Sequence, residues 1–249
     1  MDSVFLFFLT LLMLLAAAYG GKFIFKRRLE RAEVEDDEAK LILGAVLSLL
    51  GLLLGIAVSV AIGGYQDRLA AEENEASVLG SALQRSQLLP TAEQEAAEEL
   101  LQQYLTARIG FFDSGVGSEH DRWGVRSVQL QGQLWVLATE YAKQRPDSIS
   151  ASVLTAYGDL YQAQLRTQAS WRHRIPALGW WVILSFAFFA NGLIGYNIRG
   201  IKGENLLVII LPVLTTAAFY LISDIDIPGA GLIKVRPEAL QHLQLITGY

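Results

Sequence analysis

Long apolar runs without a charged residue alternate with polar segments along this chain. The uncharged runs are Val4–Gly21, Leu41–Gly64, Ala177–Ile198 and Leu206–Ser223. A helix needs about 20 apolar residues to cross a hydrocarbon core of about 30 Å. Only a helix or a closed barrel can satisfy its own backbone hydrogen bonds there. The pattern therefore predicts an all-α integral membrane protein with four transmembrane helices.

The four runs form two pairs that are separated by a long polar segment. A charged loop at 22–40 joins the first pair, and a short loop at 199–205 joins the second. Residues 65–176 lie between the pairs, and we expect them to form a helical extramembrane insert. Residues 224–249 follow the last run as a C-terminal tail.

The first run also has small residues near its end, Ala16-Ala17-Ala18, as a secretory signal does. A signal peptide begins with basic residues, however, and only Asp2 is charged before this run. We therefore expect the run to be retained as the first span.

The second run continues into the insert with helical periodicity, and only Gly63-Gly64 interrupts it. We expect one helix from Leu41 to Leu89. Small residues recur every three or four positions along its apolar part, at Gly44, Ser48, Gly51, Gly55, Ser59 and Gly63. Small side chains let helices approach closely in lipid. This face is therefore either a helix-packing seam or the wall of a pore.

The rest of the insert is predicted to be helical as well. Thr91 and Gln94 have the spacing of a capping box at the start of a helix. Glycines and serines at 110–120 predict a loop, and helices are expected at about 122–143 and 149–174.

Composition supports the membrane class and excludes several others. Charged residues are 18% of the chain, against about 25% in a typical soluble domain. The net charge of -5 gives no electrostatic reason to expect a nucleic-acid partner. The chain has no cysteine, which excludes disulfides, thiolate nucleophiles and zinc–thiolate sites.

Basic residues near the spans give a weak indication of orientation. The two short loops carry Lys22, Lys26, Arg27, Arg28, Arg31, Lys40, Arg199 and Lys202. The opposite ends of the spans carry fewer, namely Arg68, Arg166, Arg172, Arg174, Lys234 and Arg236. The difference favours short loops in the cytoplasm and the insert outside.

Four polar residues in or beside the last two runs are candidates for a site. Asn191 and Asn197 lie in an apolar run, so each amide needs a partner. The partner is either another helix or a polar lining that contacts an ion. Asp224 and Asp226 follow the fourth run. They are either solvated acids at a helix end or part of a calcium site, which needs six to eight oxygens.

The insert shows no catalytic motif. Its acidic residues are expected to form solvated helix faces, and they are Glu72, Glu73, Glu75, Glu93, Glu95, Glu98 and Glu99. His120, His173 and His242 are far apart in sequence. There is no metalloprotease helix, glycine-rich phosphate loop or nucleophile elbow. We therefore expect no enzyme and, apart from the calcium alternative, no cofactor.

Several motifs together resemble a known family. They are Glu75-Ala76-Ser77-Val78-Leu79-Gly80-Ser81-Ala82, Arg85, Leu88-Leu89-Pro90, Tyr104, Arg108, Leu134-Trp135, Asp159, Arg174-Ile175-Pro176, Asp224-Ile225-Asp226-Ile227-Pro228 and Gly231-Leu232-Ile233-Lys234-Val235. This set is similar to the bestrophin-like family of bacterial membrane proteins, also called DUF4239. Ser77 and Gln87 depart from the family pattern, which has Asn and often Asp there.

The resemblance implies a bacterial inner-membrane protein distantly similar to bestrophins, which are pentameric chloride channels. It implies a homo-oligomer, with the second span beside the pore and Asp224 and Asp226 near a calcium-binding region. It also implies an insert in the cytosol, against the count of basic residues. Fold-level likeness does not establish function.

Two functions are compatible with these observations. The first is an oligomeric ion channel, expected to carry anions, with the second span lining the pore and basic loop residues attracting anions to one mouth. The second is a non-conducting membrane scaffold whose insert binds a partner protein.

Overall fold

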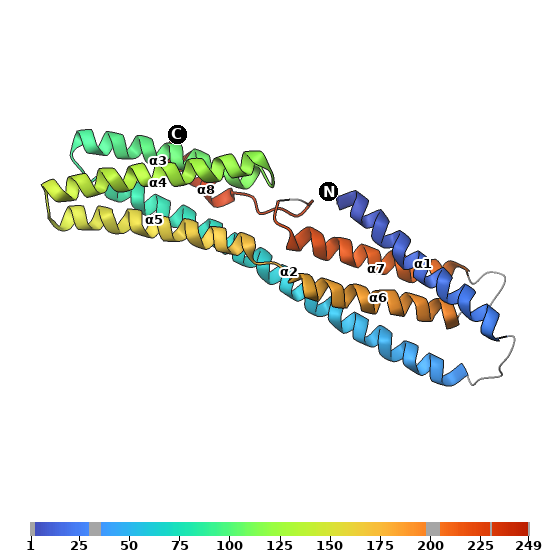
Figure 1. The fold of residues 1–249 in the computed structure, drawn as a ribbon. Helices are drawn as coiled ribbons and strands as arrows, with labels where there is room; N and C mark the ends of the chain where they lie inside the picture. Colours follow the sequence, from blue (N-terminus) through green and yellow to red (C-terminus); the bar gives the residue numbers. More distant parts are fainter. Residues whose placement is uncertain (1–2, 30–35, 198–204, 230, 249) are drawn as a thin grey trace. The chain divides into compact units, whose positions relative to one another are not determined.

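The computed structural model describes residues 3–29, 36–197, 205–229 and 231–248. These residues form eight α-helices, labelled in Figure 1. The helices are α1 (Ser3–Leu29), α2 (Asp36–Ser86), α3 (Thr91–Asp113), α4 (Ser118–Gln144), α5 (Ser148–Arg172), α6 (Ala177–Asn197), α7 (Asn205–Asp226) and α8 (Glu238–Thr247). The prediction of an all-helical chain is confirmed for the described residues.

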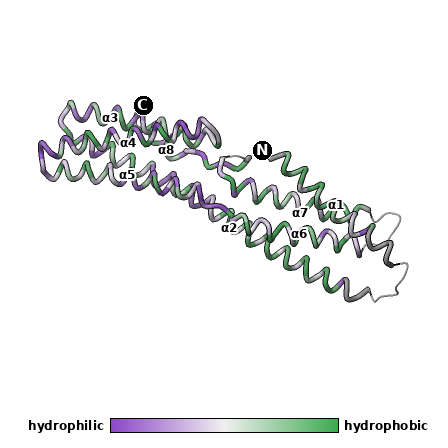
Figure 2. Tube along the Cα trace, in the orientation of Figure 1, coloured by the Kyte–Doolittle hydropathy of each residue, from purple (hydrophilic) through white to green (hydrophobic). Residues whose placement is uncertain are grey.

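The chain divides into two compact units, which α2 joins. The apolar unit comprises residues 1–62 and 174–226, and the polar unit comprises residues 63–173 and 227–249. Figure 2 shows that hydrophobic residues dominate α1, α6, α7 and the first part of α2. Within the described residues, four helical stretches contain a segment long and apolar enough to cross a membrane, and they are Phe5–Phe23, Lys40–Ser86, Ser148–Asn197 and Val208–Asp226.

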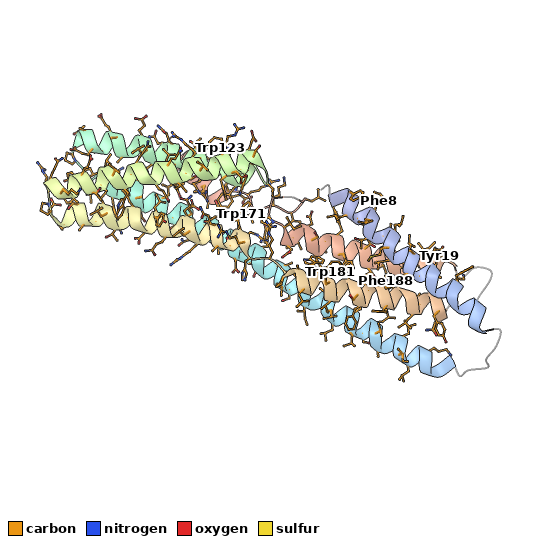
Figure 3. All side chains as sticks on the ribbon, in the orientation of Figure 1. Phe8, Tyr19, Trp123, Trp171, Trp181 and Phe188 are labelled. Carbon is orange, nitrogen blue, oxygen red and sulfur yellow. The ribbon has the colours of Figure 1, made fainter. Side chains whose placement is uncertain are left out.

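Apart from Phe219, the core of the apolar unit is made of small and aliphatic side chains. Its buried members are Leu14, Leu50, Ala57, Ala61, Ile175, Ile183, Ala187, Ala190, Phe219 and Ile222. Larger aromatic side chains lie outside this core, and Figure 3 labels Phe8, Tyr19, Trp181 and Phe188 among them. Trp181 is 69% exposed in the single chain. Such side chains are expected to contact lipid, or a second copy, in the membrane.

The closest helix contact in the apolar unit lies between α1 and α6. A Cβ added at Gly195 would overlap the carbonyl of Ala18, and one added at Gly21 would overlap the carbonyl of Gly192. Glycine is therefore required at these positions, because it lets the two backbones touch.

The polar unit is a bundle of α3, α4, α5, α8 and the second part of α2 (Figure 1). Its core contains Leu79, Leu101, Tyr104, Leu134 and Leu160, each at most 1% exposed. A helix that buries one apolar stripe in this way shows the 3.6-residue periodicity seen in the sequence.

Several helix ends and caps differ from the predictions, and α2 ends at Ser86 rather than Leu89. Helix α3 extends to Asp113 and α4 begins at Ser118, so the expected loop at 110–120 is much shorter. The predicted capping box at Thr91 is wrong, because Pro90 occupies the N-cap without a side-chain bond. A capping box occurs instead at the start of α5, between Asp147 and Ser150.

The predicted charged loop at 22–40 is helical at both ends, because α1 continues to Leu29 and α2 begins at Asp36. Residues 30–35 and 198–204 lie outside the described residues. Most of the short loop predicted at 199–205 is therefore not described. The orientation inferred from basic residues stays a prediction.

Candidate functional site

The small-residue face of α2 is uncovered within the single chain. Gly44, Ser48, Gly51, Gly55 and Ser59 are exposed, and Gly63 is half-buried. A Cβ added at any of the four glycines would have no neighbour within 4 Å. The buried side of α2 carries different residues, namely Leu50, Ala57 and Ala61. The face is therefore no packing seam inside the chain, and its occupant in the membrane is lipid, water or a second copy.

The amides of α6 make local hydrogen bonds. Asn191 Nδ2 donates to the carbonyl of Ala187 at 2.7 Å, and Asn197 Nδ2 donates to that of Leu193 at 3.2 Å. Asn191 is fully buried, and its Oδ1 accepts no bond from the described residues. In the part of the chain that the structure describes, these amide nitrogens bond within α6 rather than to another helix.

Asp224 and Asp226 lie in the last turn of α7 and are only 8% and 4% exposed. The prediction of solvated acids is therefore wrong. Asp226 Oδ1 accepts a hydrogen bond from the backbone N–H of Ile175 at 2.9 Å. This bond fixes the segment that precedes α6 to the end of α7, and it connects two of the motifs that carried the family resemblance.

Two carboxylates are too few to hold calcium, which takes six to eight oxygens. One oxygen of Asp226 is already used by Ile175. Among the described residues, no group of three or more His, Cys, Asp or Glu side chains is placed to hold a metal. Asp224 and Asp226 alone do not fit a calcium site.

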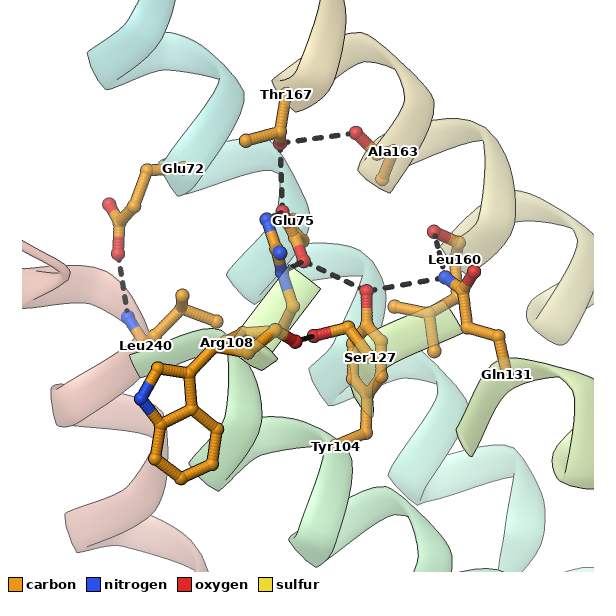
Figure 4. Close-up of polar contacts among 11 residues, drawn as sticks. Glu72, Glu75, Tyr104, Arg108, Ser127, Gln131, Leu160, Ala163, Thr167 and Leu240 are labelled. Atoms are coloured by element: carbon orange, nitrogen blue, oxygen red, sulfur yellow. Dashed lines mark hydrogen bonds and ion pairs between the residues drawn. The ribbon is translucent and has the colours of Figure 1, made fainter. Parts of the chain in front are cut away.

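A buried ion pair lies inside the polar unit, between Glu75 of α2 and Arg108 of α3 (Figure 4). Arg108 Nε and Nη2 donate to the two carboxylate oxygens at 2.5 and 3.1 Å, and both side chains are fully buried. A guanidinium binds a carboxylate with two parallel bonds in this way, which fixes direction as well as distance.

Three further side chains complete the network around Glu75. Tyr104 Oη donates to Oε1 at 2.9 Å, and Thr167 Oγ1 donates to Oε2 at 2.8 Å. Gln131 Nε2 donates to Tyr104 Oη at 3.2 Å. The network therefore joins α2, α3, α4 and α5, as Figure 4 shows.

The guanidinium of Arg108 stays charged and the hydroxyl of Tyr104 stays neutral in the folded state. Burial acts to lower the pKa of Arg108, but the neighbouring Glu75 and Tyr104 outweigh it and leave that pKa above its ordinary value. Burial and the Glu75 charge raise the pKa of Tyr104 well above the usual range, so its hydroxyl stays protonated and can donate. Removing one partner of such a pair leaves an uncompensated buried charge.

A second buried carboxylate, Glu72, caps α8. Glu72 Oε1 accepts from the backbone N–H of Leu240 at 2.9 Å. The N-cap of α8 is Pro237, which makes no side-chain cap, so α2 supplies the acceptor instead. Burial raises the pKa of Glu72. The prediction of solvated acidic faces is thus wrong for Glu72 and Glu75, although Glu73 is exposed.

The helical spacing of residues in the sequence was enough to indicate part of this network. Tyr104 lies in the apolar stripe of α3, and Arg108 follows it by one helical turn on the same face. A charged residue on the buried face of a helix requires a buried partner.

The sequence matches a known protein family over most of its length. A family model described as Bestrophin-like domain matches residues 8–240. No curated protein matches the chain, and no solved structure does.

Proposed function

The chain belongs to the bestrophin-like family, and from this membership we propose that it is an oligomeric ion channel, selective for anions, whose pore is lined by α2. The family and the four apolar helices establish a multi-pass membrane protein. Conduction and self-association are our proposal, and so is the placement of the polar unit outside the bilayer.

The observation that carries the proposal is the uncovered small face of α2. Small side chains leave room for a pore, and five exposed members of this face are Gly or Ser. The two serines add hydroxyls that can replace part of an ion's hydration shell. A face that packs against no other described helix of its own chain is free to border a pore on the axis of an oligomer.

Neighbouring positions of α2 differ in kind. Leu49, Leu52, Ile56 and Val60 are also exposed, but they are large and aliphatic. Because successive helical residues are rotated by about 100°, Ile56 faces a different direction from Gly55. We assign the aliphatic positions to lipid or to the contact between copies, and the small positions to the pore.

The test is chloride flux into liposomes that contain the purified protein. Gly55→Phe is expected to reduce flux strongly, because a ring there would enter the pore. Ile56→Phe is the matched control and should leave flux near that of the unchanged protein. Equal effects of the two substitutions would remove the assignment of the small face to the pore.

The alternative function is a non-conducting scaffold. It is favoured by large exposed apolar side chains on the polar unit, among them Val125 at 59% and Val136 at 53% exposure. A scaffold would show no flux above that of empty liposomes, and a defined partner would bind the purified chain through these residues.

A further inference from the structure

The segment that joins α7 to α8 in Figure 1 has an exposed face that takes no part in the core of the polar unit. Leu232 is 85% exposed, and Lys234 and Arg236 are exposed as well. Val235 is only 7% exposed and belongs to the core of the polar unit. The segment therefore buries one side chain and leaves one apolar and two basic side chains at the surface.

Contacts on either side of this face hold the segment against the polar unit. Before it, Gly229 touches Gly115 in the turn between α3 and α4, and a Cβ added at Gly115 would lie 2.6 Å from the Gly229 carbonyl oxygen. Both glycines have a positive φ, 70° at Gly115 and 75° at Gly229, which glycine adopts without a steric penalty. After it, Glu72 accepts from the N–H of Leu240. The exposed side chains are therefore carried by a backbone that is fixed in place.

The length of the chain keeps this segment close to the membrane. Helix α7 contains a stretch that is long and apolar enough to cross a bilayer, Val208–Asp226, and Leu232 follows Asp226 by six residues. An extended chain covers at most about 3.5 Å per residue, so Leu232 lies within about 20 Å of the end of α7. A turn at 228–229 and bends at 231–233 shorten this distance. Lipid headgroups extend roughly 6 Å beyond the hydrocarbon core, which brings them within reach of the segment.

The exposed side chains match the chemistry of a phospholipid surface. Lysine and arginine bind phosphate and are attracted to anionic lipids. In the part of the chain that the structure describes, no ion pair holds the charge of Lys234 or Arg236. An apolar side chain such as Leu232 is stabilised at the boundary between headgroups and acyl chains. Exposed apolar residues beside charged ones are typical of a surface that contacts a membrane.

The turn between α3 and α4 adds an apolar side chain but no positive charge. Val116 lies next to Gly115 in this turn and is 60% exposed. The turn is flanked by the exposed acidic residues Asp113 and Glu119. Recognition of phosphate therefore depends on the two basic residues of the segment after α7.

We propose that residues 232–236 bind the surface of the bilayer that α7 crosses. Leu232 enters the boundary between headgroups and acyl chains, and Lys234 and Arg236 contact the phosphate groups of anionic phospholipids. The contact attaches the polar unit directly to lipid. It rests on the proposed placement of the polar unit outside the bilayer and is independent of ion conduction.

The chain has no native cysteine, so a bimane fluorophore attached in Leu232→Cys reports on that position alone. The purified full chain is placed in bilayers of phosphatidylcholine with brominated acyl chains, which quench bimane on contact. Acrylamide is the quencher in water. Leu88→Cys is the matched control, because Leu88 is 53% exposed in the turn after α2. About 33 Å of helix separate Gly64, at the end of the uncharged run, from Ser86 before this turn.

Brominated lipid is expected to quench the label at position 232 and not the label at position 88. Acrylamide should quench the label at position 88 more strongly. The role of charge is measured with brominated phosphatidylglycerol diluted in phosphatidylcholine, and with the reverse mixture at the same mole fraction. Quenching at position 232 should favour phosphatidylglycerol about fivefold for each basic residue that contacts phosphate.

Lys234→Gln and Arg236→Gln should each lower this preference about fivefold, since each removes one charge. Arg145→Gln is the matched control, because Arg145 is exposed in the turn between α4 and α5. That turn precedes α5, whose 25 residues separate it from the segment before α6. The control substitution should leave the preference unchanged.

Three results would overturn the proposal. Quenching at position 232 by acrylamide and not by lipid would show that this position faces water. Quenching by neither would show that protein, such as a second copy, covers it. Lipid quenching without a preference for phosphatidylglycerol, or with one that both substitutions leave intact, would remove the role of the basic residues.

The same labels separate this proposal from the proposed function. Lipid quenching at position 88 as well would contradict the placement of the polar unit outside the bilayer. An absence of chloride flux would contradict conduction and leave the quenching pattern as expected. Circular dichroism of each variant checks that the helices are retained.

Discussion

The two units of this chain treat buried polar groups differently. In the apolar unit Asn191 and Thr215 bond to carbonyls of their own helices, those of Ala187 and Leu211, and Asp226 at the end of α7 bonds to the backbone of Ile175. In the polar unit Glu75 accepts bonds from two other helices. Close contact between helix backbones holds the apolar unit together. In the polar unit, buried apolar side chains and the hydrogen bonds of the Glu75 network act together.

The proposed surroundings of the two units, lipid for the apolar unit and water for the polar unit, give a physical reason for this difference. Lipid is as apolar as the helices themselves, so contact between them depends on fit, and glycines at the α1–α6 contact supply it. In water, apolar burial supplies the driving force but does not determine which helix packs where. A buried network can select one arrangement, because any other would leave its groups without partners.

The largest expected effect is on the Glu75 network. Glu75→Leu removes the partner of a fully buried guanidinium and should destabilise the polar unit by about 3–5 kcal/mol. The double variant Glu75→Leu with Arg108→Leu should recover part of that loss, because no unpaired charge remains. Thermal unfolding of the purified protein, followed by near-ultraviolet circular dichroism of its tryptophans, measures both.

Glu73→Leu is the matched control, since Glu73 is exposed two residues from Glu75. It should change the unfolding temperature little. If the double variant is no more stable than Glu75→Leu, the pair does not act as a unit.

A smaller effect is expected at the α1–α6 contact. Gly195→Leu forces a side chain against the backbone of Ala18, and overpacking of this kind costs about 1–3 kcal/mol. Gly55→Leu places the same side chain in open space on α2 and should be nearly neutral for the isolated chain. Unfolding of the monomer in mixed micelles compares the two, and equal losses would contradict the assignment of the tight contact to α1 and α6.

The smallest effect concerns pH. His120 stacks on Trp171 with ring centroids 4.8 Å apart, and burial lowers the pKa of His120 below 6.5. Asp121 acts in the opposite direction and Arg108 in the same one. As the pH falls below 6.5, the unfolded chain binds the proton first, so the stability contributed at higher pH is progressively lost.

His120→Gln should therefore flatten the fall in stability as the pH drops below 6.5. The free energy of unfolding is measured against pH for the unchanged protein and for His120→Gln, and one profile is subtracted from the other. The subtraction removes the contribution of Glu72, whose raised pKa changes stability with the opposite sign. Identical pH profiles would show that His120 contributes nothing to this dependence.

Much of the helical structure was predictable from the chain itself. The apolar runs predicted the membrane-crossing helices, and the unbroken periodicity from Leu41 predicted one long α2. Local patterns suffice there because a helix closes its hydrogen bonds within itself. The capping box at Thr91 was a false signal, because residues with suitable spacing can lie one position inside the true helix start.

The sites were harder to predict, because each depends on segments far apart in the chain. Glu75 looked like part of a solvated acidic run, and only the packing of α3 and α5 against α2 shows that it is buried. Asp226 looked like a solvated helix end until the Ile175 N–H was found beside it. Neither pairing follows from the spacing within one helix.

The sequence by itself determined the class of this protein, a multi-pass membrane chain of the bestrophin-like family, because four of its segments are uncharged and long enough to cross a bilayer as helices. It also marked the small face of α2. Only the tertiary structure decided that this face is left uncovered while α1 and α6 make the close contact. Which faces meet depends on how the surfaces of several helices fit together, and no single segment contains that information.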